Sequence, residues 1–201
     1  MQSRLNLRPH PAFESLRGEI EQRLRAVGLL IDQSTFLDVF DYRMREALQI
    51  AFSLAGAHEG TVWLVDREHT SLVPAFNNGA DPDEFLKRVG RQPLSSGIIS
   101  GVFIRDQAHC ENAVQSNAVH DKRVDRVMGL VTTAQIAVPL HFAGECRGVI
   151  SCVQLTTPGT DAPTPSGFPL ESLRAVEFGA DVLGRLLDHA LLNATLGLST
   201  R

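Results

Sequence analysis

The chain has 201 residues, 43% of them hydrophobic, which suits one well-buried domain rather than two. Its net charge is −4 and its 19 basic residues are scattered, so no basic face for nucleic acid is expected. No apolar run approaches the roughly 18 residues of a membrane span, and no apolar leader follows Met1, so we expect a cytoplasmic protein without membrane contact. Three cysteines without metal-type spacing predict neither a disulfide framework nor a metal site.

The first segment, residues 1–34, is predicted to be an amphipathic helix followed by a connector. Apolar residues recur every three or four positions over 13–27, with charged residues between them. A cap at Ser34 or Thr35 can start a second helix, because one apolar stripe then continues to Leu54. We expect this second helix to lie on a sheet.

The next elements are short. Two runs rich in β-branched and aromatic residues, 61–65 and 71–76, predict a first hairpin. Four elements are expected after it. A short helix is expected at 82–89 and a glycine-flanked turn entering a helix or bent segment at 93–103. A short strand is expected at 108–114 and another short helix at 119–130.

The centre of the sheet is predicted at 133–155, where two apolar runs flank one turn. Gly144 can adopt positive φ in this turn at little cost. Neither run alternates cleanly between apolar and polar residues, so both faces of the hairpin are expected to be covered. One face suits the long helices, and the other, through Gln135, Ala137 and Ser151, suits the floor of a pocket.

Proline and glycine crowd residues 156–169, which predicts a mobile loop. Apolar residues then alternate spacings of three and four from Leu173 to Ala194, which predicts a long amphipathic helix. The apolar surface of this helix is wider than one packing contact requires. We therefore expect one side of the helix to pack on the sheet and the other side to pack on a second copy of the chain. The alternative is that the whole stripe is intramolecular core. Residues 194–201 are expected to form a tail.

Five weak motifs occur in a fixed order along the chain. They are Gly60-Thr-Val-Trp-Leu-Val-Asp66, Leu94-Ser-Ser-Gly-Ile-Ile-Ser-Gly-Val-Phe103, Asp121-Lys-Arg-Val-Asp125, Ile136-Ala-Val-Pro-Leu140 and Gly148-Val-Ile-Ser-Cys-Val153. In this order and spacing, between helices, they resemble the GAF domain, a small-molecule-binding sensory module of phosphodiesterases, phytochromes and bacterial signalling proteins. The resemblance covers residues 35–193, which we take as a single domain with a long C-terminal helix.

The resemblance implies an α+β fold related to profilin and PAS folds. Its central antiparallel sheet would have about five or six strands, with the terminal helices on one face. A ligand pocket on the other face would be closed by short helices and loops. Dimers through the terminal helices are common in such proteins.

Nine residues are candidates for the pocket. Polar side chains interrupt the two central apolar runs, and a buried hydroxyl or amide without a partner costs about 1 to 3 kcal/mol. A ligand or a water can be that partner, and small-molecule pockets are mostly apolar with a few convergent polar groups. The alternative is that these are ordinary core residues with local hydrogen bonds. The candidates are Phe76, Ile98, Phe103, Val124 and Met128 for the apolar walls, and Thr132, Thr133, Gln135 and Ser151 for the polar groups.

Departures from the patterns of known members argue against three activities. Cyclic-nucleotide-binding members carry an Asn-Lys pair where this chain has Gln154 and Leu155. Bilin-attaching members carry Cys directly before His, whereas here Val119 precedes His120. The cysteine that free methionine sulfoxide reductases have in the glycine-rich segment is absent from 97–103. We therefore do not expect an enzyme.

The sequence thus predicts a non-catalytic, cytoplasmic sensory domain that binds an unidentified small molecule, dimerises through its terminal helices and signals to a partner in trans. Two alternatives remain open: a ligand-free dimerisation scaffold and a thiol-dependent free methionine sulfoxide reductase. No metal is expected at His109 and Cys110, because adjacent strand positions point to opposite faces. The sequence names no cofactor.

Overall fold

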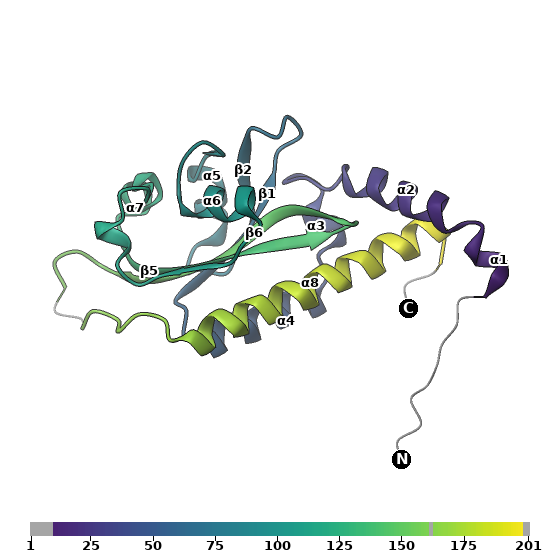
Figure 1. The fold of residues 1–201 in the computed structure, drawn as a ribbon. Helices are drawn as coiled ribbons and strands as arrows, with labels where there is room; N and C mark the ends of the chain where they lie inside the picture. The colour runs from purple at the N-terminus through teal and green to yellow at the C-terminus, as the bar shows by residue number, and fades with distance from the viewer. Residues whose placement is uncertain (1–9, 161–162, 199–201) are drawn as a thin grey trace, which may run out of the picture.

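The computed structural model describes residues 10–160 and 163–198. Its centre is a six-stranded antiparallel sheet in the order β3-β2-β1-β6-β5-β4. Helices lie on both faces of this sheet (Figure 1), which confirms the predicted α+β class. The strands are β1 (Glu59–Val65), β2 (Ser71–Asn77), β3 (Gln92–Pro93), β4 (His109–Glu111), β5 (Val131–Phe142) and β6 (Glu145–Thr156).

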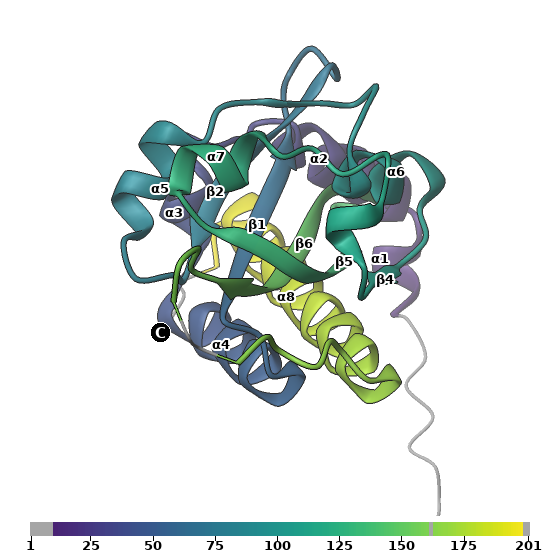
Figure 2. The ribbon, with the colours of Figure 1, turned by 90° about the vertical axis from the view of Figure 1, so that its left-hand side faces the viewer.

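The sheet separates two groups of helices. In chain order the helices are α1 (Pro11–Glu14), α2 (Arg17–Gly28), α3 (Phe36–Val39), α4 (Tyr42–Ala55), α5 (Pro82–Arg88), α6 (Ile98–Arg105), α7 (Arg123–Met128) and α8 (Leu170–Leu196), with a 3-10 turn at Val114–Ser116. α4 and α8 lie side by side on one face, and α5, α6 and α7 cover the other (Figure 2). No helix within 10–160 and 163–198 is long and apolar enough to cross a membrane.

The central hairpin is formed by β5 and β6, the two longest strands. Its two-residue turn consists of Ala143 and Gly144, with φ of 52° and 79°. A tight turn of this kind needs positive φ at both positions, which confirms the prediction for Gly144. Ala143 adopts this costly conformation while its N–H donates to Asp188 Oδ1 of α8 at 2.6 Å. The hairpin tip is therefore tied to the C-terminal helix.

Both faces of the hairpin are covered, as predicted. Every second side chain of β5 faces the main core formed with α4 and α8, namely Ala134, Ile136, Val138, Leu140 and Phe142. On the opposite face, Ala137 and Val149 join a smaller core with Trp63 of β1, Phe85 of α5 and Val102 of α6. The hairpin is thus buried between two separate apolar clusters.

One predicted helix is divided in two. The expected continuous helix ends as α3 and restarts as α4, because Phe40 leaves the helical conformation with φ −86° and ψ 86°. The Asp41 carboxylate then accepts hydrogen bonds from the N–H groups of Arg43 and Met44, at 2.9 and 3.0 Å. An aspartate that caps a helix in this way competes with an uninterrupted helix. The apolar stripe continues through the break, which is why periodicity alone did not reveal it.

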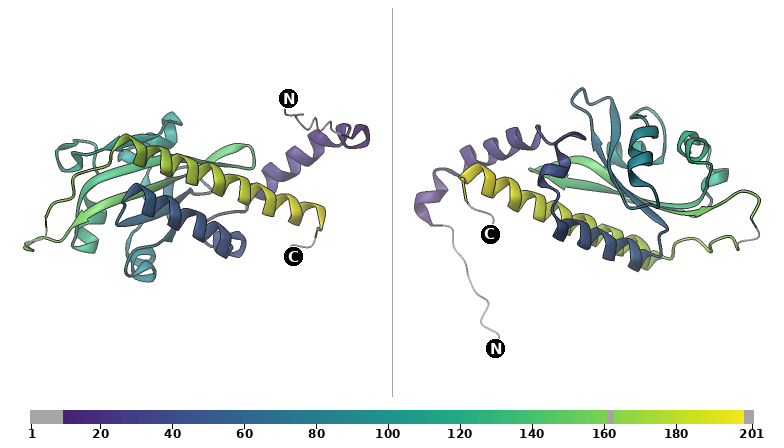
Figure 3. Two further views of the ribbon diagram at one scale, coloured as in Figure 1. Left: turned by 90° about the horizontal axis from the view of Figure 1, so that it is seen from below. Right: turned by 180° about the vertical axis from the view of Figure 1, so that it is seen from behind.

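The first long helix of the chain, α2, lies beside the last helix, α8. α2 packs against the C-terminal part of α8 (Figure 3), and Arg147 Nη2 donates to Arg25 O at 3.3 Å. The division at 34 and 193 stays a prediction. The expected tail 194–201 begins inside α8, and residues 199–201, like 1–9, lie outside the described residues. In the expected loop 156–169, the described residues after Thr156 form neither helix nor strand. Residues 161–162 lie outside the described part of the chain.

α8 approaches β5 closely at Gly184. A Cβ atom at this position would lie 2.2 Å from the backbone oxygen of His141, a contact that real Cβ atoms do not make. Gly179 similarly brings α8 against α4, since its Cβ would lie 2.5 Å from the Cβ of Ala51. The absence of side chains at these two positions allows the helix to lie on the sheet.

We expect Gly184→Ala to lower the free energy of unfolding by about 1 to 3 kcal/mol, because the added methyl overpacks a contact with rigid backbone. Urea unfolding followed by circular dichroism measures this change. Gly18→Ala in α2 is the matched control, since its Cβ would meet nothing within 4 Å. Alanine is the better helix former, so the control should be neutral or slightly more stable. Equal effects of the two substitutions would contradict the proposed close contact.

Candidate functional site

A cavity of about 80 Å³ lies between β1, β5 and β6 on one side and α5, α6 and α7 on the other. Six of the nine predicted residues line it, namely Ile98, Val124, Met128, Thr132, Gln135 and Ser151. The structure thus brings these six side chains together, and their contact with a ligand stays a prediction. Further residues that were not predicted from the sequence also line the cavity, among them Glu59, Thr61, Trp63, Phe85, Gln92, His120, Asp125 and Leu155.

The other three predicted residues do not line this cavity, contrary to the place expected for them. Phe76 faces the main core, with its ring centroid 4.8 Å from that of Phe40, because alternation along β2 turns it toward the long helices. Phe103 packs against the smaller core from α6 and does not line the cavity. Thr133 lies at an irregularity in the β5–β6 pairing, where its hydroxyl donates to Gln154 O at 3.0 Å.

The floor of the cavity contains two buried hydroxyl groups. Trp63 Nε1 donates to Ser151 Oγ at 3.0 Å, and Asn77 Nδ2 donates to Thr61 Oγ1 at 3.0 Å. A hydroxyl can accept such bonds and still donate its own hydrogen. Ser151 and Thr61 therefore each present a fixed oxygen and a rotatable hydroxyl hydrogen toward the cavity. Trp63 and Asn77 were not identified from the sequence, because they act across strands.

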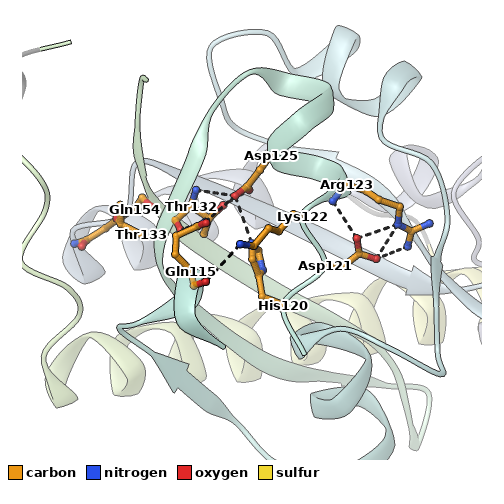
Figure 4. Close-up of polar contacts among 9 residues, drawn as sticks. All are labelled: Gln115, His120, Asp121, Lys122, Arg123, Asp125, Thr132, Thr133 and Gln154. Atoms are coloured by element: carbon orange, nitrogen blue, oxygen red, sulfur yellow. Dashed lines mark hydrogen bonds and ion pairs between the residues drawn. The ribbon is translucent and has the colours of Figure 1, made fainter. Parts of the chain in front are cut away.

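Asp125 of α7 is the hub of a buried polar cluster (Figure 4). Its carboxylate accepts from Thr132 Oγ1 at 2.6 Å, from Thr132 N at 3.1 Å and from Gln115 Nε2 at 3.0 Å. His120 Nε2 lies 3.4 Å from the same carboxylate. Burial acts to raise the pKa of Asp125, but the hydrogen bonds from His120 and Thr132 outweigh it and hold that pKa below its usual range. Asp125 thus fixes α7 to the start of β5.

A second set of polar contacts joins the chain before α7 to the chain before α6. Arg123 Nε donates to both oxygens of Asp121, at 3.0 and 2.8 Å (Figure 4), and Arg123 Nη2 donates to Gln92 Oε1 at 3.2 Å. Gln92 Nε2 in turn donates to Ser96 O at 2.7 Å. The hydrogen bond from Arg123 holds the pKa of Asp121 below its usual range. These contacts form one wall of the cavity.

The inner cavity is acidic. Glu59, Asp121 and Asp125 line it together with His120, and among the described residues no lysine or arginine does so. Burial raises the pKa of Glu59, so negative charge is disfavoured at that end of the cavity. The inner cavity therefore suits a neutral or hydrogen-donating group better than an anion.

A wider groove of about 760 Å³ adjoins the cavity on the outside. The two share Gly97, Ile98, His120 and Asp121, so these residues separate the inner cavity from the groove. Four cationic side chains line the groove, namely Arg105, Lys122, Arg123 and Arg126. The outer part of the site thus has the opposite charge from the inner part.

The three cysteines all lie in the described part of the chain, and none of them lines the cavity. Burial raises the pKa of Cys152 to about 12, and it also raises the pKa of Cys110. Cys110 packs against the main core while His109 lines the outer groove. This confirms that the two neighbours point to opposite faces of β4.

The end of β6 carries the two residues at which the sequence departs from cyclic-nucleotide-binding proteins. Gln154 Nε2 donates to Gly56 O at 3.2 Å, and Gln154 Oε1 accepts from Gly167 N at 3.0 Å. Gln154 therefore holds the chain after β6 in place. Leu155 lines the inner cavity and supplies an apolar wall.

Comparison with solved structures relates this architecture to GAF domains. The GAF-B domain of DevS from Mycobacterium smegmatis aligns with a TM-score of 0.55 and 22% identity over 84% of this chain and 100% of that chain. The GAF domain of Acinetobacter phosphoenolpyruvate-protein phosphotransferase gives 0.52 and 15%, over 80% and 96%. The type II free methionine-R-sulfoxide reductase from Thermoplasma acidophilum gives 0.54 and 16%, over 79% and 96%.

The chain therefore has the fold of GAF domains, as the sequence motifs predicted. No protein-family profile matches the chain, and a search of curated sequences found no match. The structural neighbours include GAF domains and a free methionine-R-sulfoxide reductase, so at these identities the likeness defines the fold alone.

We expect Asp125→Asn to lower the free energy of unfolding at pH 7 by about 1 to 3 kcal/mol, because it weakens a buried, charge-assisted cluster. The pKa of Asp125 is depressed in the folded protein, so its contribution is present above the unfolded value of about 3.9 and is lost as the pH falls through the folded pKa. Urea unfolding at several pH values should therefore show wild type and variant converging below about pH 4.

The control for this pH dependence is Asp181→Asn. Asp181 is exposed and its bond with Arg185 is an i,i+4 surface pair. Such pairs contribute only about 0.3 to 0.5 kcal/mol. A difference between Asp125→Asn and wild type that is the same at every pH would show that the carboxylate charge does not matter.

Proposed function

We propose that this protein is a cytoplasmic, non-catalytic sensory domain that binds a small molecule in the cavity between the sheet and α5 to α7. The observation that carries the proposal is the convergence of buried and half-buried polar groups on one cavity with apolar walls. Ser151, Thr61 and Gln135 reach it from three strands, and Asp125 reaches it from α7. Small-molecule sites combine mostly apolar walls with a few such groups.

The charge distribution narrows the class of ligand. The acidic inner cavity favours a neutral or hydrogen-donating group, whereas the groove outside carries Arg105, Lys122 and Arg126. We therefore propose a small ligand whose uncharged end occupies the cavity and whose anionic end lies in the groove. The inner volume admits only a few atoms, so binding of a larger group requires the wall at His120 and Asp121 to move.

We expect at least one compound in a panel of nucleotides, bilins, haem, amino acids and 2-oxo acids to raise the melting temperature. A ligand at about 100 times its Kd stabilises the folded state by about 2.7 kcal/mol. Gln135→Leu should weaken that response because it removes an amide from the cavity at similar volume. Arg126→Gln should weaken the response to anionic compounds but not to neutral ones.

The matched control is Gln33→Leu, at an exposed position in the connector before α3. Its melting-temperature response to the same compound should equal that of wild type. A response that is unchanged in Gln135→Leu would place the ligand outside the cavity. No stabilisation by any compound, together with a crystal structure in which side chains fill the cavity, would favour the ligand-free scaffold.

The scaffold is the second candidate, and the observation that favours it is the small cavity volume of about 80 Å³. Typical pockets for drug-sized molecules are about 300 to 1,000 Å³. The thiol-enzyme alternative is less well supported, because the three cysteines lie away from the cavity and burial raises their pKa values. Turnover of free methionine sulfoxide with a thiol donor, lost on replacing the cysteines, would contradict the non-catalytic proposal.

We further propose that ligand binding is read through a homodimer of the long helices by a partner in trans. α4 and α8 carry exposed apolar side chains on their outer sides, including Ile50, Leu54 and Phe178, with exposures of 57%, 72% and 69%. Large exposed apolar residues gathered on two adjacent helices are typical of an interface. A ligand shifts the equilibrium between two helix arrangements only if it binds one of them more tightly than the other. Each tenfold difference in affinity supplies about 1.4 kcal/mol of free energy for this shift.

We expect light scattering at micromolar concentration to give twice the chain mass of 22.0 kDa. Phe178→Glu should yield the monomer, because it places a charge in the apolar interface. Ile104→Glu is the matched control, since Ile104 is 62% exposed on α6, across the sheet from the long helices. A monomeric wild type, or equal dissociation of both variants, would contradict the proposed interface.

A further inference from the structure

Three side chains of different chemistry meet where the end of α6 approaches the tip of the central hairpin. Asp106 follows α6, His141 lies in β5 and Cys146 lies in β6. The carboxylate, imidazole and thiol atoms all lie within 4.8 Å of one another. His141 Nε2 is 2.9 Å from Asp106 Oδ1. The cluster is separate from the cavity and the outer groove, whose linings do not include these three residues.

Rigid backbone brings these groups together. His141 and Cys146 are directly paired across the hairpin, next to an irregularity in its register at Leu140. Asp106 caps α6 in the left-handed conformation, with φ 52°, and its N–H donates to Val102 O. A ligand set carried by two paired strands and a helix end is held in place before any ion binds.

We propose that Asp106, His141 and Cys146 form a binding site for a divalent transition metal ion of the zinc type. Carboxylate oxygen, imidazole nitrogen and thiolate sulfur are the ligand atoms that Zn²⁺ takes in proteins. The thiolate and the imidazole select such an ion over Mg²⁺ or Ca²⁺. Three protein ligands leave the fourth tetrahedral position to a water molecule. The C-terminal end of α6 adds partial negative charge, which favours a cation there.

The accessibility of the cluster suits an ion arriving from solvent. The side chains of Asp106 and His141 are 54% and 53% exposed, so an ion reaches them without opening the core. Cys146 is half-buried, and its Sγ lies 3.6 Å from Gly148 O. When the metal binds, the S–H bond breaks, the proton passes to solvent and a metal–sulfur bond forms, with no change of oxidation state. The bound ion would join α6, which lines the cavity at its other end, to the hairpin.

The test is titration of the full chain, kept reduced, with Zn²⁺ by calorimetry and with Co²⁺ as a spectroscopic probe. We expect one ion per chain and a thiolate-to-cobalt charge-transfer band in the near ultraviolet that Zn²⁺ abolishes. Cys146→Ser should remove the band and weaken Zn²⁺ binding about tenfold or more. His141→Gln should weaken binding to a similar extent.

The matched control is Cys110→Ser, since Cys110 is another half-buried cysteine beside a histidine, His109. It should bind Zn²⁺ and Co²⁺ as wild type does. His141 is exposed, so His141→Gln should remain folded, and Zn²⁺ should raise its melting temperature less than it raises that of wild type. The absence of a bound ion in wild type, a cobalt band that survives Cys146→Ser, or a band lost in Cys110→Ser would each overturn the proposal.

Discussion

The structure depends on the burial of the central hairpin on both faces. One face of β5 contributes its apolar residues to the core under α4 and α8, while the other face contributes Ala137 to the smaller core and Gln135 to the cavity. Because successive strand residues point to opposite faces, a register shift of one residue would exchange the two sets. The register of this hairpin therefore decides at once where the long helices pack and which polar groups reach the site.

The contact of α8 with the hairpin links the site to the chain ends. Gly184 allows α8 to lie against the backbone of His141, and Asp188 accepts a hydrogen bond from the turn residue Ala143. The same strands that floor the cavity thus contact the helix proposed to form the dimer. In the proposed sensory role, a change in the cavity wall at β5 would have to cross only one layer of packed side chains to reach α8.

Two kinds of polar site are built on this framework in different ways. In the cluster around Asp125, Asp125 and Thr132 are buried and hydrogen-bonded to each other, so the cluster holds α7 against β5 and shapes the cavity. The cluster of Asp106, His141 and Cys146 is open to solvent at the other end of α6. The Asp125 cluster is suited to holding the cavity wall in place, and the Asp106 cluster is suited to receiving an ion from solution.

The sequence by itself determined the elements, because apolar periodicity and turn residues are local properties: the hairpins, the long C-terminal helix and the positive φ of Gly144 were predicted from them. It also identified six of the residues that line the cavity, from polar residues within apolar runs. Tertiary structure decided the rest. The break at Asp41 and the contacts of Asp125 use partners close in sequence, but apolar periodicity did not reveal them. The side of the sheet that Phe76 faces and the meeting of His141 with Asp106, 2.9 Å apart, depend on partners distant in sequence. Contacts of that kind are fixed by strand register and helix packing, which one-dimensional spacing does not contain.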